Sequence, residues 1–498
     1  MNTNLYPLRL KNILTGFIIL LITCNIWASP VPNSAATSAS ANKHGVTTPN
    51  HPFPQFENIS PYILADGTQA IYPTGSGITP NSRKIDVENY YNLWKQNYIT
   101  TGPTYDGHTT YRVRLGKVED KSAQHKTKVG QHNNRIVTYL FNKSSGKKSN
   151  EYPLSDITVS EGQGYGMIIT VMMAGFDPQA QQIFDGLFRY VKAYPSKLDD
   201  NLMSWIITPA NDAGHAANNS AFDGDADIAL ALVLASQQWN SSPNGIDYMA
   251  EAKTIIASIK NKTIGPDSHL PMLGDWVTSG KYNQWAPRSS DFMLDNFRVF
   301  GFIDPTQHAY WEQVINSSHA AINHIQTQYS ANTGLLPDFT QNSGNSINAI
   351  QPAPADYLED EYDGDYAYNA ARTPWRIGAD ALLNRDATSL AQVRKMSNWI
   401  KTHSSNNIDN IYSGYHLNGN DIGEEYNSSL FTAPFGVAAM TVTNGGSTQQ
   451  KWLKDIYTAV KKFDNDEEDY YEHTISMLSL LIMTGNYWNP ATFEDNKD

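Results

Sequence analysis

The chain contains almost no cysteine. Its 498 residues include a single one, Cys24, close to the N-terminus. The sequence beyond that residue therefore has no thiol for a disulfide or a cysteine-ligated metal. The 13 histidines show no His-Glu-x-x-His or comparable ligand spacing, and neither a phosphate loop nor a dinucleotide fingerprint is present. We therefore expect no metal and no other cofactor.

Positive charge is also scarce. Lysine and arginine total 36 against 49 aspartates and glutamates, which gives a net charge of −13. Nucleic-acid binding needs a basic face, so we exclude nucleic acid as a partner. An acidic protein suits export, or a ligand that is neutral or cationic. Aromatic residues, by contrast, are plentiful, with 28 Tyr, 17 Phe and 11 Trp. They serve either an aromatic core or the stacking of sugars in a cleft.

Only the N-terminal segment has the pattern of a targeting sequence. Arg9 and Lys11 precede an apolar run, Ile13–Ile22, and small residues follow it. This pattern predicts a signal peptide over residues 1–28, and the run is too short for a membrane-spanning helix. We therefore expect a secreted or periplasmic protein, with no membrane attachment after cleavage unless Cys24 is lipidated.

The rest of the chain has mainly helical periodicity. Residues 29–55 are rich in Ser, Ala, Asn, Thr and Pro and predict a flexible leader, followed by one domain over 56–498. Short strands are expected at 110–115 and 135–141. Apolar spacing predicts twelve helices, near 84–98, 161–175, 178–192, 224–238, 246–261, 288–301, 307–328, 366–383, 388–403, 428–442, 448–463 and 469–486.

The predicted helices form close pairs, and no run of strands alternates with them. A helical solenoid would show sequence self-similarity at a fixed period, and none is visible. We therefore predict an all-α fold, an (α/α)6 barrel of six helical hairpins. Long loops and a few short strands would surround an open cleft at one end.

The first unusual stretch is Ser160–Met167. Ser160 followed by Gln163 predicts a capping box at a helix start. Yet three glycines lie in the first two turns, and each costs about 1 kcal/mol relative to alanine inside a helix. Glycine at such positions indicates that something approaches the backbone closely. Because local rules tend to fail at functional sites, Glu161 is the first catalytic candidate.

The second stretch has three aspartates at steps of two, beginning at Asp223, and opens an apolar helix that runs to Trp239. They serve either as cap and dipole partners or as a cluster that raises a neighbour's pKa. The helix dipole lowers the pKa of Glu161, so a general acid there needs burial or a carboxylate such as Asp223 beside it. Paired carboxylates of this kind are the working groups of glycoside hydrolysis.

A third stretch carries two arginines. Arg372 and Arg376 lie one helical turn apart and point the same way. Pro374 indicates that the regular helix begins near this point. The arginines either balance an acidic protein or pair with the carboxylates described above.

Together, Ser160–Met167, Ala221–Trp239 and Tyr368–Arg376 resemble glycoside hydrolase family 8. The resemblance extends from about Asp86 onward, with Phe222 as a departure where the family usually has Ser or Thr. The family consists of inverting endo-β-1,4-glycanases on an (α/α)6 barrel, including cellulases, chitosanases, lichenases and some xylanases.

The resemblance also implies roles for individual residues. Glu161 corresponds to the general acid, and Asp223 to the aspartate that holds the sugar at the cleavage point. Cellulase-type members carry an aspartate base where this chain has Asn369, which cannot accept a proton at useful pH. Asparagine there resembles the chitosanase-containing subgroup, whose base is a glutamate on an upstream loop. The loop 355–365 is acidic.

In that loop Glu359 is the expected base and Glu361 the alternative. An inverting enzyme leaves room for a water between base and sugar, with the two carboxyl groups roughly 6.5–9.5 Å apart. The remaining candidates are substrate-binding residues, each of which could instead belong to the core. They are Tyr165, Trp205, Trp276, Trp285, Asn369, Arg372, Trp375 and Arg376.

We therefore expect a monomeric, secreted, inverting endo-β-1,4-glycanase whose partner is a polysaccharide. Chitosan is the favoured substrate, because a polycation would be attracted to an acidic protein. The alternatives are an endoglucanase or lichenase acting on cellulose-type or mixed-linkage β-glucan, and a non-catalytic glycan-binding protein. A polysaccharide lyase would need basic residues for a uronate, which the net charge disfavours.

Overall fold

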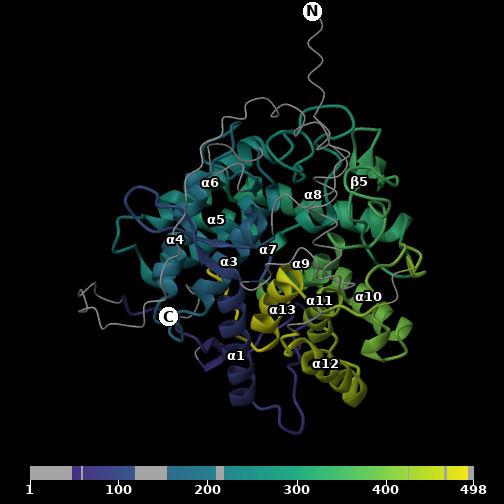
Figure 1. The fold of residues 1–498 in the computed structure, drawn as a ribbon. Helices are drawn as coiled ribbons and strands as arrows, with labels where there is room; N and C mark the ends of the chain where they lie inside the picture. Colours follow the sequence, from purple (N-terminus) through teal and green to yellow (C-terminus); the bar gives the residue numbers. More distant parts are fainter. Residues whose placement is uncertain are drawn as a thin grey trace, which may run out of the picture.

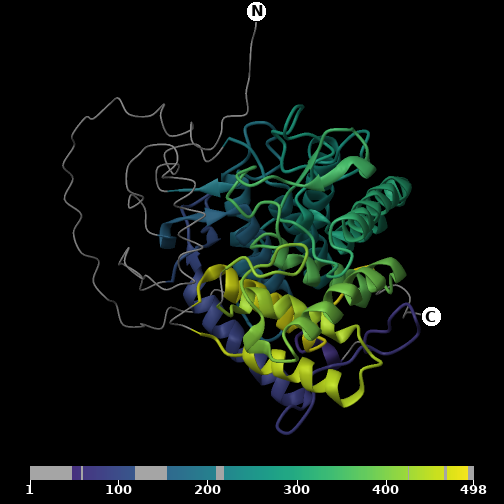
Figure 2. The same cartoon turned by 90° about the vertical axis from the view of Figure 1, so that its right-hand side faces the viewer.

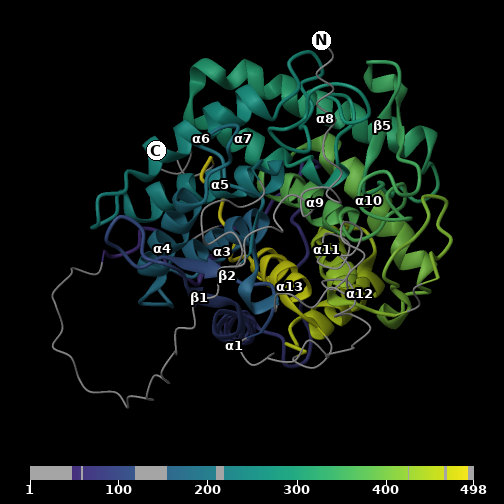
Figure 3. The ribbon, with the colours of Figure 1, turned by 45° about the horizontal axis from the view of Figure 1, so that its top comes forward.

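The computed structural model describes residues 47–57, 60–117, 154–208, 218–423, 426–464 and 468–491. Within these ranges it has twelve α-helices, which confirm the twelve predicted segments. They form two concentric rings (Figure 3), the architecture of an (α/α)6 barrel. The inner ring contains α3 (Ser160–Met172), α5 (Phe222–Trp239), α7 (Leu294–Ile303), α9 (Thr373–Leu383), α11 (Ser429–Met440) and α13 (Tyr470–Met483).

The outer ring alternates with the inner one along the chain (Figure 1). It contains α1 (Pro80–Tyr98), α4 (Ala180–Ala193), α6 (Tyr248–Lys262), α8 (His308–Gln328), α10 (Ala387–His403) and α12 (Gly446–Val460). The inner helices are buried on nearly every face, and α11 carries no charged residue at all. The outer helices bury one stripe and expose the other, as amphipathic surface helices do.

The ring closes where the first helix meets the last. The indole of Trp94 in α1 donates a hydrogen bond to Thr474 Oγ1 in α13 at 2.9 Å. The Tyr98 hydroxyl bonds His473 Nδ1 at 2.6 Å. Figure 2 shows the same pair side by side, α1 in dark blue and the C-terminal helices in yellow. Segments nearly 400 residues apart thus form one wall.

In the part of the chain that the structure describes, six short strands form three antiparallel pairs. They are β1 (Ile99–Thr101) with β2 (Tyr111–Val113), β3 (Thr158–Val159) with β4 (Ile206–Ile207), and β5 (Thr340–Asn342) with β6 (Ile350–Pro352). Strand β2 confirms the strand predicted at 110–115, whereas 135–141 lies outside the described residues. Strand β3 runs directly into α3, so its pairing with β4 sets the direction in which α3 begins.

Two helix starts differ from the predictions. The segment predicted as a helix from 288 begins with a 3₁₀ turn, Ser289–Asp291, and α7 starts only at Leu294. The segment predicted from 366 has a 3₁₀ turn at Ala370–Arg372 before α9. Pro374 lies in the first turn of α9, which confirms the helix start inferred from that residue.

The predicted leader also ends earlier than residue 56. Phe53 is buried, and its N–H donates to the carbonyl of Ala174 at 2.7 Å. Gln55 is buried as well. The described part of the leader therefore belongs to the folded domain. The predicted signal peptide and Cys24 lie outside the described residues, and none of the described helices is long and apolar enough to cross a membrane.

Candidate active site

The start of α3 is not held by the predicted capping box. The residue before the helix is Val159, and Ser160 Oγ has no hydrogen-bond partner among the described residues. The Gln163 side chain instead accepts from Val113 N–H at 3.0 Å. Its amide donates to the carbonyls of Tyr111 and Leu187, both at 3.0 Å. Neighbouring elements, rather than the helix's own cap, therefore position its first turn.

Gly164 of α3 and Gly224 of α5 allow very close packing between these two helices. A Cβ on Gly164 would lie 2.8 Å from Asp227 Cβ and 3.1 Å from the carbonyl oxygen of Gly224. A Cβ on Gly224 would lie 2.6 Å from the carbonyl carbon of Ser160. The predicted close approach is confirmed, and protein backbone makes it. This packing brings Glu161 and Asp223, in the first turns of α3 and α5, to the same place.

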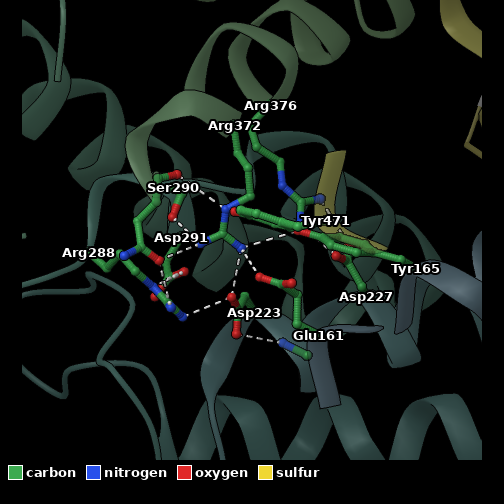
Figure 4. Close-up of polar contacts among 12 residues, drawn as sticks. Glu161, Tyr165, Asp223, Asp227, Arg288, Ser290, Asp291, Arg372, Arg376 and Tyr471 are labelled. Atoms are coloured by element: carbon green, nitrogen blue, oxygen red, sulfur yellow. Dashed lines mark hydrogen bonds and ion pairs between the residues drawn. The ribbon is translucent and has the colours of Figure 1, made fainter. Parts of the chain in front are cut away.

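Arg372 joins these two carboxylates. Its Nη1 donates to Glu161 Oε2 at 2.7 Å and to Asp223 Oδ2 at 2.8 Å, and its side chain is fully buried. Its Nη2 donates to Ser290 Oγ at 2.7 Å and to Asn369 Oδ1 at 3.1 Å. Figure 4 shows the guanidinium between them. The predicted pairing of this arginine with the carboxylates is confirmed.

Arg376 pairs with the third aspartate instead. Its two Nη atoms donate to the two oxygens of Asp227 at 3.0 and 2.6 Å. Its guanidinium carbon lies 4.0 Å from the centre of the Trp375 ring. The pair is buried in the barrel beneath the site. Arg376 therefore ties α9 to α5, and this pairing does not fit the prediction that Arg376 binds substrate.

A second cation, which sequence reasoning missed, also contacts Asp223. Arg288 Nη2 lies 2.9 Å from Asp223 Oδ2, and its Nε donates to Asp291 Oδ1 at 3.0 Å. Its Nη1 donates to Asn369 Oδ1 at 3.3 Å. Burial raises the pKa of Asp291 to about 6. The available signal was an Arg-x-x-Asp spacing shortly after Trp285, at the start of the segment predicted as a helix from 288.

The two first-turn carboxyls differ in their ionisation. Burial raises the pKa of Glu161 to about 7; Arg372 opposes this shift and the nearby Asp223 charge supports it. Burial also opposes ionisation of Asp223, but Arg288 and Arg372 outweigh it and hold its pKa well below the usual range. At neutral pH the site can therefore hold a protonated Glu161 beside an ionised Asp223.

Glu359 reaches the same cluster from its loop. Asn369 Nδ2 donates to Glu359 Oε2 at 2.9 Å, so the asparagine links Glu359 to Arg372 and Arg288. Burial raises the pKa of Glu359 to about 7, with a further contribution from Asp363. Glu361, the alternative, is exposed on the protein surface. The structure thus brings together Glu161, Asp223, Asn369 and Glu359 but not Glu361.

The aromatic candidates divide into two groups. Tyr165 and Trp375 are 0% and 2% exposed and pack edge to face at 5.9 Å, so neither ring offers an open face to a sugar. Their assignment to substrate stacking does not fit this placement, because the arginine pair covers them. Trp205, Trp276 and Trp285 are half-buried and keep accessible surface. They remain candidates for stacking.

Two tyrosines at the start of α13 were also missed. The Tyr470 hydroxyl donates to Glu161 Oε1 at 3.2 Å. The ring of Tyr471 lies 6.0 Å from the Arg372 guanidinium carbon (Figure 4). Their signal was a pair of tyrosines following an acidic run at a helix start.

A group of side chains that could ligate a metal ion lies elsewhere in the barrel. Among the described residues, His319, Asp380 and Asp386 have ligand atoms close to one another. Arg298 already lies 2.6 Å from Asp380 and 2.9 Å from Asp386, so a guanidinium neutralises this group. It contributes nothing to the cluster around Glu161.

Known proteins match this chain in sequence over most of its length. The sequence model of glycosyl hydrolases family 8 matches residues 140–485. A β-glucanase of Niallia circulans is 42% identical over 350 residues, 70% of this chain and 82% of the relative. An endoglucanase of Bacillus sp. (strain KSM-330) is 33% identical over 93% of this chain and 87% of its own.

The fold has a close solved counterpart. The apo structure of a β-1,3-1,4-glucanase from Paenibacillus sp. X4 superimposes with a TM-score of 0.73. It is 36% identical, and the match covers 89% of this chain and all of the other. The printed names of these three relatives all refer to glucanases.

Proposed function

Because the chain belongs to glycosyl hydrolases family 8, we propose that it is an endo-β-glucanase that hydrolyses β-1,4 bonds by inversion. One observation carries the proposal. Two half-buried carboxyls with pKa values raised to about 7, Glu161 and Glu359, are linked through Arg372 and Asn369 to the ionised Asp223. Inverting hydrolysis needs such a pair, one carboxyl protonated and one ionised.

Glu161 is the proposed general acid. A pKa near 7 keeps a large fraction of this carboxyl protonated at neutral pH, so it can protonate the leaving glycosidic oxygen. Asp223 stays ionised because Arg288 and Arg372 both contact it. Its fixed negative charge would stabilise the positive charge that develops on the sugar ring in the oxocarbenium-like transition state.

Glu359 is the proposed general base. Asn369 Oδ1 accepts hydrogen bonds from both arginines, which fixes the amide so that its Nδ2 points to Glu359. An aspartate at this position could not donate that hydrogen bond. The amide therefore aims the carboxylate, and the remaining lone pairs of Glu359 can accept a proton from the attacking water.

The relatives favour a β-glucan over the chitosan expected from the sequence. Three carboxylates of the acidic loop 355–365 make contacts inside the protein. The Asp363 carboxylate accepts backbone N–H groups, and Asp360 Oδ1 accepts from Tyr362 N–H at 2.7 Å. Asp365 lies 2.9 Å from His416 Nδ1. These carboxylates are less available to attract a polycation, so a mixed-linkage or cellulose-type glucan is the proposed substrate.

A side-by-side reducing-sugar assay tests the proposal. Mixed-linkage β-glucan, carboxymethyl cellulose, chitosan and xylan are compared at one pH, with Glu161→Gln as the matched inactive control. We expect the highest rate on mixed-linkage β-glucan and an inverted anomer in NMR spectra of the first products. A higher rate on chitosan would refute the substrate, and a retained anomer would refute the mechanism. No release of product from any polysaccharide would favour a glycan-binding protein.

A further inference from the structure

The proposed base lies on a segment without regular structure. Between β6 and the 3₁₀ turn at Ala370–Arg372 the chain forms no helix or strand. A catalytic carboxyl must nevertheless be held to within about 0.5 Å of its productive position. The contacts that hold the backbone of Glu359 therefore decide whether it can act.

Asp363 makes those contacts. Its Oδ2 accepts from the backbone N–H groups of Leu358 at 2.5 Å and Glu359 at 2.9 Å, and its Oδ1 accepts from Asp360 N–H at 3.1 Å. The side chain is 1% exposed. Three successive N–H groups around one carboxylate form an anion-binding nest. Here the anion belongs to the protein itself, and one of the three groups is the N–H of the proposed base.

A second aspartate holds the partner of Glu359 in the same way. Asp338 accepts from the backbone N–H groups of Ala367 and Asn369, both at 3.1 Å, and of Ala370 at 2.6 Å. Two loops, each fixed by one buried carboxyl and three N–H groups, thus meet at the hydrogen bond between Asn369 and Glu359. Both ends of that bond are positioned by backbone contacts.

The outer side of the loop is anchored to a different insertion. The Tyr357 hydroxyl donates to the carbonyl of Lys281 at 2.6 Å, and the Tyr282 hydroxyl donates to the carbonyl of Tyr357 at 2.7 Å. The Lys281 ammonium lies 4.4 Å from the centre of the Tyr357 ring. The residue two positions before Glu359 is therefore fixed, and Asp363 holds the turn that follows.

We propose that Asp363 is a positioning residue for the reaction, whose carboxylate holds the Glu359 backbone so that its side chain faces Asn369 and the reacting water. The proposal rests on the proposed role of Glu359 as the base. It predicts two separable effects of Asp363. Its oxygens fix the loop, and its negative charge favours the protonated form of Glu359.

The charge of Asp363 shifts the pKa of Glu359 in a known direction. Two carboxylates of its own loop, Asp363 and Asp360, raise the pKa of Glu359. Arg288 and the hydrogen bond from Asn369 lower it. Asp338, on a different segment, also lies close enough to interact with it. Replacing Asp363 with a neutral amide removes a raising charge, so the pKa of Glu359 falls. Because the base must be ionised, the acidic limb of the pH–kcat profile then moves to lower pH.

Asp363→Asn is the decisive variant. Asparagine keeps one acceptor oxygen but carries no charge. We therefore expect the acidic limb of the pH–kcat profile to move down by about one pH unit. We expect kcat at the optimum to fall at least about tenfold, since small misplacements of a reacting group are costly, with KM nearly unchanged. Asp365→Asn is the matched control, because its carboxylate bonds His416 and not the Glu359 backbone. It should leave both the limb and kcat unchanged.

The outcomes separate this proposal from the assignment of the base. If Glu359→Gln stays active, the base is elsewhere and the role of Asp363 falls with it. If Glu359→Gln is inactive but Asp363→Asn keeps the wild-type limb and kcat, only the role of Asp363 is refuted. Should Asp363→Asn fail to fold, Asp363→Glu is measured instead. It keeps the charge but displaces the acceptor oxygens, so kcat should fall while the acidic limb stays in place, and an unchanged kcat would refute the proposal.

Discussion

Glu161 and Glu359 are held by two different kinds of structure. Glu161 lies in the first turn of α3, an inner helix in which all residues except Glu161 are buried. Glu359 lies in a loop that is fixed by hydrogen bonds to Asp363 and Asn369 and by contacts around Tyr357. Moving Glu161 requires repacking the barrel, whereas moving Glu359 requires breaking a few polar contacts near the surface.

Substitutions around Glu161 and around Glu359 should therefore differ in how they affect stability and activity. Perturbing the helix side should lower both together, because the same packing supports the fold and places the acid. Perturbing the loop side should lower activity while the barrel stays intact. Variants on each side can therefore test whether stability and activity separate in this way.

The largest effect is expected from the two carboxyls themselves. Glu161→Gln and Glu359→Gln should each lose about 10²–10⁴-fold in kcat, the range of general acid–base catalysis. The two should differ on aryl glycosides with an acidic leaving group. Such a group needs no protonation, so Glu161→Gln should recover much of its rate and Glu359→Gln should not. Steady-state assays on polysaccharide and aryl substrate measure both.

Glu361→Gln serves as the matched control for this experiment. Its side chain is exposed and should be dispensable. If Glu361→Gln loses activity while Glu359→Gln keeps it, the base is Glu361. The contacts that hold Glu359 would then have no role in catalysis.

The next largest effect is expected where α3 meets α5. In Gly164→Ala the added Cβ would lie 2.8 Å from Asp227 Cβ. Overpacking should outweigh the helix propensity of alanine and cost about 1–2 kcal/mol of unfolding free energy, and displacement of Glu161 should lower kcat about tenfold or more. Urea unfolding and kcat are measured on the same preparation. Lost stability with full activity would show that the packing does not place the acid.

The smallest effect concerns the alkaline limb. The Tyr470 hydroxyl stabilises the ionised form of Glu161, so Tyr470→Phe raises its pKa. Because the acid must be protonated, the alkaline limb should move to higher pH. A net hydrogen bond of about 1 kcal/mol corresponds to about 0.7 pH unit. The acidic limb, which reports Glu359, should stay in place.

Tyr471→Phe is the control for that measurement. Its hydroxyl donates to the carbonyl of Tyr368 at 3.2 Å and not to Glu161. A shift of the acidic limb in Tyr470→Phe would mean that the two carboxyls titrate as one unit, and the separation into acid and base sides would then fail.

The sequence predicts the barrel well because its helices carry strong apolar periodicity. It also singles out Glu161, Asp223 and Arg372, which contact one another in the structure, since charged groups at the starts of apolar helices stand out against their surroundings. The capping box at Ser160 was wrong because Gln163 finds partners on β2 and α4, which no local pattern reveals.

Other parts of the site depend on contacts between distant segments. Arg288 becomes a site residue only because its short 3₁₀ turn packs against the start of α5. Asp338 and Asp363 look like ordinary loop aspartates in the sequence, and their burial and backbone partners come from the fold. Trp375 resembles a stacking residue but is covered by Arg376. Sequence shows which residue types are present, and packing decides which are accessible.

The closure of the ring by α13 has a consequence for how the protein is made. The acid in the first inner helix receives its phenol partner from the last one, Tyr470, which lies 309 residues later. At translation rates of roughly 5–20 residues per second, the ribosome needs roughly 15 to 60 s to bridge that interval. During this time Glu161 is without the contact that completes its surroundings. A nascent chain can therefore assemble most of its barrel before the surroundings of its proposed catalytic acid are complete.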